Sequence, residues 1–254
     1  MKYTLDTIPV LDVYRMDCEC PLCRLRIDCE DLYVDSMLGA AYMEPDCRVK
    51  TNETGFCERH FSLMFDRRNR LGLALMTHTH MLEVISSLEK ILADGQAAQR
   101  GGLLSALRGS AKADSAAPQK IRARIGGCVI CEQVDSAVER YAYTIAQLAF
   151  SSHEFRALLE ESKGFCLPHF ALILELADRT LGAQQAAEFK KLISELELKN
   201  LRRVADDLEW FTLKFDYRNA DKPWGNSRDA VERGVNKLMG ACIGDEAHMP
   251  PHND

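Results

Sequence analysis

The chain reads Cys20-Pro21-Leu22-Cys23 and then, after a spacer, Gly55-Phe56-Cys57-Glu58-Arg59-His60-Phe61. The same pattern returns as Cys128-Val129-Ile130-Cys131 and Gly164-Phe165-Cys166-Leu167-Pro168-His169-Phe170. Each copy is a C-x2-C pair followed by a C-x2-H pair, with 33 spacer residues between the pairs in the first copy and 34 in the second. Two near-equal spacings of the same four side chains are very improbable by chance. The sequence therefore indicates an internal duplication around a set of metal ligands.

Three cysteines and one histidine suit tetrahedral Zn²⁺, which prefers four protein ligands in closed structural sites. The sequence therefore predicts two zinc ions per chain, one bound by each copy. An iron–sulfur cluster is the alternative for a thiolate-rich set. Redox dithiols or buried free cysteines are the alternative without a metal, and the repeated histidine argues against them. The predicted ligands are Cys20, Cys23, Cys57 and His60 in the first copy, and Cys128, Cys131, Cys166 and His169 in the second.

The remaining cysteines of the ten are Cys18, Cys29, Cys47 and Cys242. Cys20 is preferred to Cys18 as a ligand because only Cys20 has a counterpart in the second copy, so we expect Cys18 to be a surface thiol. A further hypothesis makes Cys47 a reactive thiol, since Arg48 and Lys50 would favour the thiolate if they approach it. The sequence assigns no role to Cys29 or Cys242.

The composition argues against several classes of protein. With 254 residues, of which 46% are hydrophobic and 28% charged, the chain has the make-up of a globular protein with a sizeable core. The net charge of −6 and the lack of a basic run argue against nucleic acid as a partner. No stretch reaches the ~18 consecutive apolar residues of a membrane span, and the acidic N-terminal residues argue against a signal peptide. We therefore expect a cytoplasmic protein whose cysteines serve metal ligation or redox chemistry.

Hydrophobic periodicity predicts an all-α fold of two similar helical halves, each with a Cys3His metal site, and a C-terminal helical extension. Residues 1–19 are expected as a short extended lead-in, with one helical turn as the alternative, and 42–54 as a polar loop with a proline stop. The predicted helices cover 21–43, 56 onward, 71–92, 129–150, 152–161, 165–177, 182–215 and a stretch ending near 239.

The same patterns divide the chain into five parts, and no strand pattern of useful length is present. The linker is rich in Gly, Ala, Ser and Gln, with one helical turn suggested at Leu103 to Leu107. The parts are a first helical repeat at 1–93, a flexible linker at 94–120, a second helical repeat at 121–216, the extension at 217–243 and a disordered tail at 244–254.

The loop at 42–52 is the best candidate for a functional surface, because it collects several polar side chains and its counterpart in the second copy is chemically different. His78 and His80 lie on the helix that follows, about 200° apart, so they cannot chelate one metal from a regular helix. The competing interpretation is a polar inter-helix loop with a hydrogen-bonded core histidine. The candidate site residues are Tyr42, Glu44, Asp46, Arg48, His78 and His80.

Three functional hypotheses follow from these features. The first is a zinc-stabilised scaffold whose 42–52 loop, together with His78, binds a small molecule or a protein partner. The second is an enzyme in which Glu44 or Asp46 acts as a base and His78 as an acid or electrophile, which requires the three side chains to converge in a pocket. The third is a metal or thiol redox sensor whose ligands release zinc on oxidation. The sequence names no substrate and no oligomeric state.

The chain also resembles a bacterial family of unknown function with no characterised activity. The resemblance covers most of the chain outside the linker and the tail, and it implies a cytoplasmic helical protein with paired Cys/His sites. In the family pattern the residue at the position of Cys47 need not be cysteine, which weakens the reactive-thiol hypothesis. The motifs that carry the resemblance are the two C-x2-C…G-F-C-x2-H sets, Tyr42-Met43-Glu44-Pro45-Asp46, Leu71-Gly72-Leu73-Ala74-Leu75-Met76 with His78-Thr79-His80, and Pro223-Trp224-Gly225-Asn226-Ser227.

Overall fold

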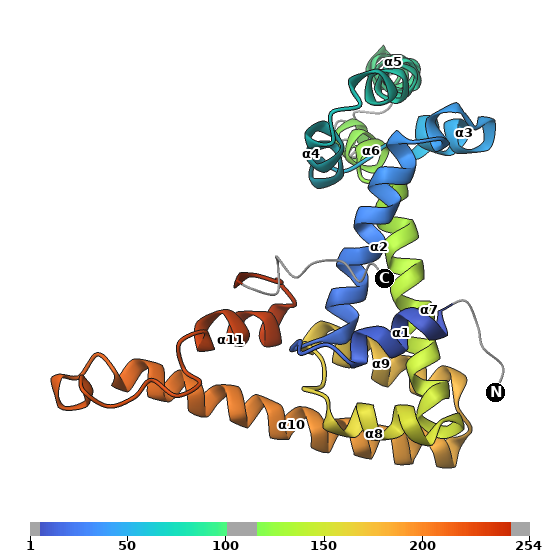
Figure 1. Cartoon of the computed structure of the whole chain (residues 1–254). Helices are drawn as coiled ribbons and strands as arrows, with labels where there is room; N and C mark the ends of the chain where they lie inside the picture. Colours follow the sequence, from blue (N-terminus) through green and yellow to red (C-terminus); the bar gives the residue numbers. More distant parts are fainter. Residues whose placement is uncertain (1–5, 101–115, 245–254) are drawn as a thin grey trace, which may run out of the picture. The chain divides into compact units, whose positions relative to one another are not determined.

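The structure, a computed structural model, describes residues 6–100 and 116–244. Eleven α-helices and short 3-10 turns make up the described chain, which contains no strand, so the predicted all-α class is confirmed (Figure 1). Within these residues, none of the helices combines the length and the apolar character needed to cross a bilayer.

The chain forms two compact units, which we call unit 1 (Met1–Cys29 with Asp135–Asp254) and unit 2 (Glu30–Val134). These units do not follow the predicted repeats at 1–93 and 121–216. Two helices pass from one unit into the other: α2 begins in unit 1 and ends in unit 2, and α7 runs from unit 2 into unit 1. Their bounds are Pro21–Leu38 for α2 and Val129–Ser151 for α7.

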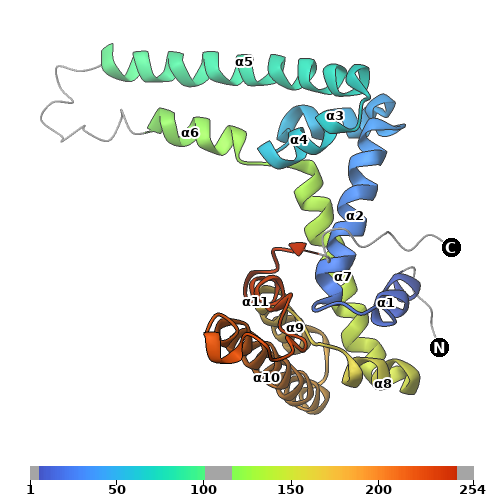
Figure 2. The ribbon, with the colours of Figure 1, turned by 60° about the vertical axis from the view of Figure 1, so that its left-hand side comes forward.

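Unit 2 is built around the long helix α5, which spans Arg70–Arg100. Its Leu73 and Met76 are buried, and α3, α4 and α6 contact it. Figure 2 shows these helices lying along one side of α5. The other elements of the unit are η1 (Ala41–Met43), α3 (Pro45–Thr54), α4 (Glu58–Asp66) and α6 (Ala116–Ile125).

Unit 1 contains a second long helix, α10, against which α9 and α11 pack. After α10 the chain turns back on itself, and the Lys214 ammonium donates to the carbonyls of Asn219, Ala220 and Lys222 within that turn. Phe211 and Trp224 pack ring against ring across it. The helices of the unit are α1 (Thr7–Tyr14), α8 (His153–Glu161), α9 (Leu167–Thr180), α10 (Ala183–Leu213) and α11 (Ala230–Met239), with η3 at Tyr217–Asn219.

Three of the expected non-helical segments are helical in the structure. The predicted lead-in at 1–19 contains α1, which buries Val10, Val13 and Tyr14, a spacing of three and four residues that makes one helical face. The predicted polar loop at 42–54 contains η1 and α3, because Pro45 occupies the first turn of α3, where its missing N–H costs little.

The predicted linker at 94–120 is helical at both ends. Helix α5 continues to Arg100 and α6 begins at Ala116, in segments rich in Ala and Gln, which favour helix. The turn expected at Leu103 to Leu107 and the tail beyond Gly244 lie outside the described residues.

Candidate metal centres

All four Cys/His pairs are placed at the start of a helix. The C-x2-C pairs open α2 and α7, and the C-x2-H pairs open α4 and α9, where Cys57 and Cys166 are the N-cap residues. The two N-caps have nearly the same backbone angles, with φ of −75° and −76°. Unpaired N–H groups and the positive end of the helix dipole favour thiolates at such positions. The local fold therefore prepares each pair for a cation.

The two glycines before these N-caps fix the direction of the chain. Gly55 has a φ of +76° and Gly164 a φ of +79°, a region that other residues rarely adopt. A Cβ atom on Gly55 would lie 2.5 Å from the His80 ring, and one on Gly164 would lie 2.5 Å from Oε2 of Glu197. The repeated Gly-Phe-Cys sequence thus provides a tight turn that packs directly against the long helix of each unit.

One ligand cluster lies in unit 2 and consists of Cys57, His60, Cys128 and Cys131. Nδ1 of His60 lies 3.1 Å from Sγ of Cys128, 3.2 Å from that of Cys57 and 3.4 Å from that of Cys131. The Sγ atoms of Cys57 and Cys131 are 3.8 Å apart. We call this group the unit-2 cluster.

The other ligand cluster lies in unit 1 and consists of Cys20, Cys23, Cys166 and His169. Nδ1 of His169 lies 3.4 Å from Sγ of Cys20 and 3.3 Å from those of Cys23 and Cys166. The Sγ atoms of Cys23 and Cys166 are 3.5 Å apart. We call this group the unit-1 cluster.

The prediction that each sequence copy forms its own site is wrong in its pairing. All eight predicted ligands are used, but each cluster joins the C-x2-C pair of one copy to the C-x2-H pair of the other. The reason lies in α2 and α7, which each begin at a C-x2-C pair in one unit and continue into the other unit. The spacer of 33 residues between the pairs of the first copy identifies candidate ligands. It does not show which two pairs form one cluster, because it does not show where the helix between the pairs leads.

Both clusters fit a tetrahedral zinc ion. Bond lengths of ~2.3 Å to sulfur and ~2.0 Å to nitrogen place tetrahedral ligand atoms roughly 3.6 to 3.8 Å apart. The ligand atoms of each cluster all lie within 4.8 Å of one another, and the closest pairs are 3.1 to 3.8 Å apart. One histidine nitrogen and three sulfurs make a closed set of four in each case.

The thiols of each cluster differ in acidity because they share hydrogen bonds. Burial raises the pKa of Cys128, but hydrogen bonds with His60 and with the backbone N–H groups of Cys131 and Cys57 lower it to about 6. Hydrogen bonds from Cys20 and Cys23 lower the pKa of Cys166. Burial raises the pKa of Cys20 and that of Cys131, and hydrogen bonds with Cys166 and Cys20 raise the pKa of Cys23, so these thiols stay protonated without a cation. A divalent cation stabilises the thiolate form of all its cysteine ligands, so metal binding releases the protons of these thiols.

In the unit-2 cluster the histidine is oriented by a carboxylate. Nε2 of His60 donates to Oε1 of Glu30 over 3.1 Å, which leaves Nδ1 free to bind a metal. Arg59 holds the same carboxylate with two hydrogen bonds of 2.9 and 2.5 Å. Burial raises the pKa of Glu30, but the hydrogen bonds from His60 and Arg59 outweigh it and lower the pKa to about 2. Glu30 is therefore a fixed anion beside the metal ligand.

In the unit-1 cluster the support comes from buried ions around the Gly164 turn. Oε2 of Glu197 accepts from the backbone N–H of Phe165 over 2.7 Å, and the Lys237 ammonium donates to the carbonyls of Lys163 and Phe165. Nζ of Lys237 lies 3.7 Å from Glu197 and 3.8 Å from Glu19. All three charged side chains are 1% exposed. No described residue pairs with Nε2 of His169.

Helix α11 closes the unit-1 cluster from outside. A Cβ atom on Gly240 would lie 2.9 Å from Sγ of Cys166 and 3.2 Å from that of Cys23, so only glycine allows this approach. Cys242 follows two residues later, and its thiol is a hydrogen-bond partner of Cys23. The predicted extension at 217–243 is thus part of the site.

The candidate residues Glu44 and Asp46 lie at the surface, as does His78. All three are exposed, and no hydrogen bond or ion pair joins their side chains among the described residues. Tyr42 is half-buried and packs against Gly72. The convergence that the enzyme hypothesis requires is missing.

The other motif residues of this region hold α3 against α5. Arg48 donates to Oγ1 of Thr79 over 2.8 Å, and Thr79 donates to Oδ1 of Asn52 over 2.5 Å. Nδ1 of His80 donates to the carbonyl of Asn52, which also accepts from Arg124. The network accounts for Arg48 and His80 as structural residues.

Two of the unassigned cysteines differ from expectation. Cys18 is 6% exposed, so it is not a surface thiol. The pKa of Cys47 is raised, because burial outweighs the effects of Lys50 and Arg48, so its thiolate is disfavoured.

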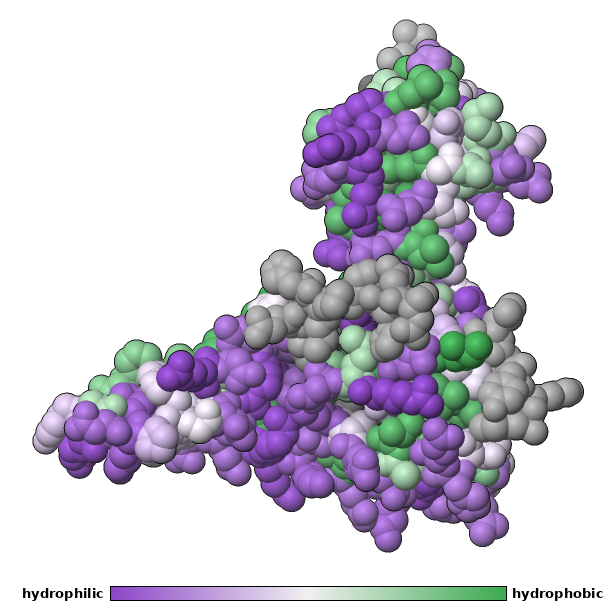
Figure 3. Space-filling view, in the orientation of Figure 1, coloured by the Kyte–Doolittle hydropathy of each residue, from purple (hydrophilic) through white to green (hydrophobic). Residues whose placement is uncertain are grey.

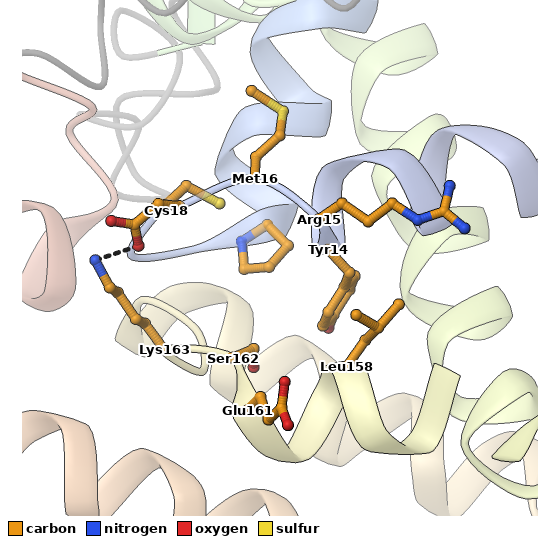
Figure 4. Close-up of a pocket in the computed structure, with 10 residues that line it drawn as sticks. Tyr14, Arg15, Met16, Cys18, Leu158, Glu161, Ser162 and Lys163 are labelled. Atoms are coloured by element: carbon orange, nitrogen blue, oxygen red, sulfur yellow. Dashed lines mark ion pairs between the residues drawn. The ribbon is translucent and has the colours of Figure 1, made fainter. Parts of the chain in front are cut away.

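A cavity of about 420 Å³ lies beside Cys18 in unit 1. Tyr14, Leu158 and Lys163 point toward it in Figure 4. The Tyr14 hydroxyl is buried without a hydrogen-bond partner. The lining mixes both charges with apolar groups and so indicates no ligand class.

Sequence reasoning missed the residues that support the clusters. Glu30, Arg59, Glu197, Lys237 and Gly240 carry no motif of their own, and their partners are distant in the chain. Arg59 alone gave a signal, since it lies inside the C-x2-H pair.

The match to known proteins is limited to a family model. The model described as "Family of unknown function (DUF6062)" matches residues 1–245. No curated protein and no solved structure matches the chain.

Proposed function

Because the chain belongs to this family of unknown function, its role has to come from the two clusters, and we propose that it is a scaffold protein held together by two structural zinc ions. The observation that carries the proposal is the closed set of three thiols and one imidazole in each unit. Structural zinc sites use four protein ligands, whereas catalytic sites keep a position for water or substrate.

The placement of the ligands supports a structural role. Each cluster draws on the starts of two helices that are far apart in the chain, so an ion bound there cross-links its unit. Such binding energy is folding energy, because an unfolded chain holds no preformed site. Six ligand thiols have to stay reduced, and we therefore propose a reducing compartment such as the cytoplasm.

The first test is the metal content of the purified full chain. Two zinc ions per chain without visible absorption are expected. Iron with a charge-transfer band would contradict the proposal, as would a folded chain that contains no metal.

Double substitutions test which ligands share an ion. Cys20→Ser with Cys166→Ser removes two ligands of one cluster, so native mass spectrometry of the folded fraction should find one zinc. Cys20→Ser with Cys57→Ser damages both clusters and should leave none. If the ligands paired within each sequence copy, Cys20→Ser with Cys166→Ser would leave no zinc, and Cys20→Ser with Cys57→Ser would leave one. Cys29→Ser is the matched control, since Cys29 is buried like Cys20 and Cys166 but belongs to no cluster.

A redox sensor is the second candidate function, and Cys242 favours it. Its thiol lies beside Cys23, at the unit-1 cluster. Hydrogen peroxide would take two electrons from the Cys23 and Cys242 thiolates, an S–S bond would form, and the peroxide with two protons would become two water molecules. The zinc would leave because Cys23 is lost as a ligand.

Zinc release during peroxide treatment tests this second function. Wild type should release one zinc per chain first, and Cys242→Ser should slow that release at least about tenfold. Cys47→Ser serves as the control, because Cys47 lies outside both clusters. Equal release from wild type and Cys242→Ser would rule the sensor out.

A further inference from the structure

Helix α5 presents a long apolar stripe that nothing in the described chain covers. The stripe advances by four and three residues in turn, which is the spacing of a coiled-coil seam. Leu71 is 67% exposed, Leu82 52% and Ile85 46%. Its members, from the first to the last, are Leu71, Leu75, His78, Leu82, Ile85, Glu89 and Leu92, and all are exposed.

The stripe lies opposite the face through which α5 packs in its own unit. Leu73 and Met76 are buried on the packed face, and His80 bonds to α3 from there. Leu82 follows Leu73 by nine residues, which at 100° per residue is about 180° around the helix. The side chains of the stripe are therefore unavailable to α3, α4 and α6.

The outer face of α5 carries little charge. Ala74 and Met81 flank the seam and are exposed as well. The only ionisable members of the seam are His78 and Glu89. In Figure 3, hydrophobic residues reach the surface at the top, where α5 is seen end-on, whereas the surface over α10 in that view is mainly hydrophilic.

The seam is complementary to itself when a second copy runs in the opposite direction. With a two-fold axis between Glu83 and Val84, Leu82 faces Ile85 of the second copy and Leu75 faces Leu92 of the second copy. His78 then faces Glu89 of the second copy. From Leu75 to Leu92 every apolar layer meets an apolar layer, and the one basic group meets the one acidic group.

We propose that α5 pairs with α5 of a second copy as an antiparallel coiled coil that makes the protein a dimer. Over Leu71 to Leu92 the seam is about 33 Å long at 1.5 Å per residue. A two-fold axis makes the contact closed, since the same surface is used on both chains. A parallel pair would instead place Glu89 against Glu89 and His78 against His78. This inference goes beyond the zinc scaffold and does not depend on the identity of the metal.

Sedimentation of the full chain at micromolar concentrations is the first test. Wild type should be a dimer, and Leu82→Glu should weaken dimerisation at least about 100-fold, because it buries a carboxylate at the centre of the seam. Leu32→Glu is the matched control, since Leu32 is a leucine of the same unit that is 66% exposed but lies on α2. A monomeric wild type, or a dimer that Leu82→Glu leaves intact, would overturn the proposal.

A charge exchange tests the direction of the helices. Glu89→Lys alone should weaken the dimer, because Lys then faces His78 of the second copy. Combining it with His78→Glu should restore the dimer only in the antiparallel register. A parallel pair would be weakened further by the double exchange, which would contradict the proposed direction. An unchanged zinc content and an unchanged helical circular dichroism in these variants separate a failure of this proposal from a failure of the zinc sites.

Discussion

The unit-1 and unit-2 clusters have the same ligands but different supports. In the unit-2 cluster a single side chain, Glu30, orients the ligand histidine through its free nitrogen. In the unit-1 cluster the histidine has no such partner among the described residues, and buried ions instead hold the backbone that leads to the cysteine. The unit-2 cluster is therefore supported at its ligand His60, and the unit-1 cluster at the turn that precedes its ligand Cys166.

This difference shows that a ligand motif does not determine which neighbouring residues support the ligands. A carboxylate bonded to the outer nitrogen fixes the tautomer and the orientation of an imidazole. A buried ion network fixes a peptide unit instead, and it is costly unless every charge is paired. We therefore expect substitution of Glu30, the support of the unit-2 cluster, to affect metal affinity, and substitution of the buried ions that support the unit-1 cluster to affect folding.

The largest effect should come from the ligands themselves. Cys128→Ser and Cys166→Ser should each remove one zinc per chain and destabilise the affected unit by more than about 4 kcal/mol. Hydrogen exchange followed by mass spectrometry should locate the loss of protection in unit 2 for Cys128→Ser and in unit 1 for Cys166→Ser. Loss of protection in both units from either change would show that the clusters are not independent.

A smaller but still large effect is expected at the buried ammonium. Lys237→Met should destabilise unit 1 by about 3 to 5 kcal/mol, because it removes the buried ammonium that lies beside the carboxylates of Glu197 and Glu19 and bonds the carbonyl of Phe165. Thermal and denaturant unfolding measure the loss. Lys191→Met is the control, since that side chain is 78% exposed and should change stability by less than about 0.5 kcal/mol. Similar values for both would contradict the role of the ion network.

The two positive-φ glycines allow a direct comparison of the turns. Gly55→Ala and Gly164→Ala should each cost about 1 to 3 kcal/mol, because an L side chain is strained at these angles. The two costs should be similar, because a hydrogen bond fixes the neighbouring side chain at each turn, His80 beside Gly55 and Glu197 beside Gly164. Gly182→Ala adds a Cβ that meets nothing within 4 Å, so it should cost less than about 1 kcal/mol in the same unfolding assay. An equal cost at all three positions would refute the tight-turn explanation.

The smallest predicted effect is a loss of zinc affinity and not a loss of folding stability. Glu30→Gln should weaken zinc binding at the unit-2 cluster about 10- to 100-fold, because the neutral amide orients His60 less well. Competition with a chromogenic chelator gives the affinity, and the unit-1 cluster in the same chain is the internal reference. Asp31→Asn, at an exposed neighbouring carboxylate, should leave both affinities unchanged. A weakening at both clusters would count against a local role of Glu30.

Several features of the structure could be predicted from the sequence because they depend on short stretches of chain. The helix class followed from hydrophobic periodicity, and all eight cluster residues followed from the repeated spacing. The sequence does not predict helix α3, because a proline such as Pro45 can either stop a helix or occupy its first turn, and the local pattern does not distinguish the two. Glu30 and Lys237 could not be found, since their partners are 29 or more residues away.

By itself the sequence determined which side chains form the candidate ligand clusters, because the C-x2-C and C-x2-H spacings are local properties of a helix start. Only the tertiary structure decided which pairs come together. The paths of α2 and α7 bring the C-x2-C pair of each copy to the C-x2-H pair of the other, and packing of the whole helix sets such a path. The structure also decided that the stripe at Leu71 to Leu92 is an outer face, because periodicity reports that a helix has an apolar side and not what covers it.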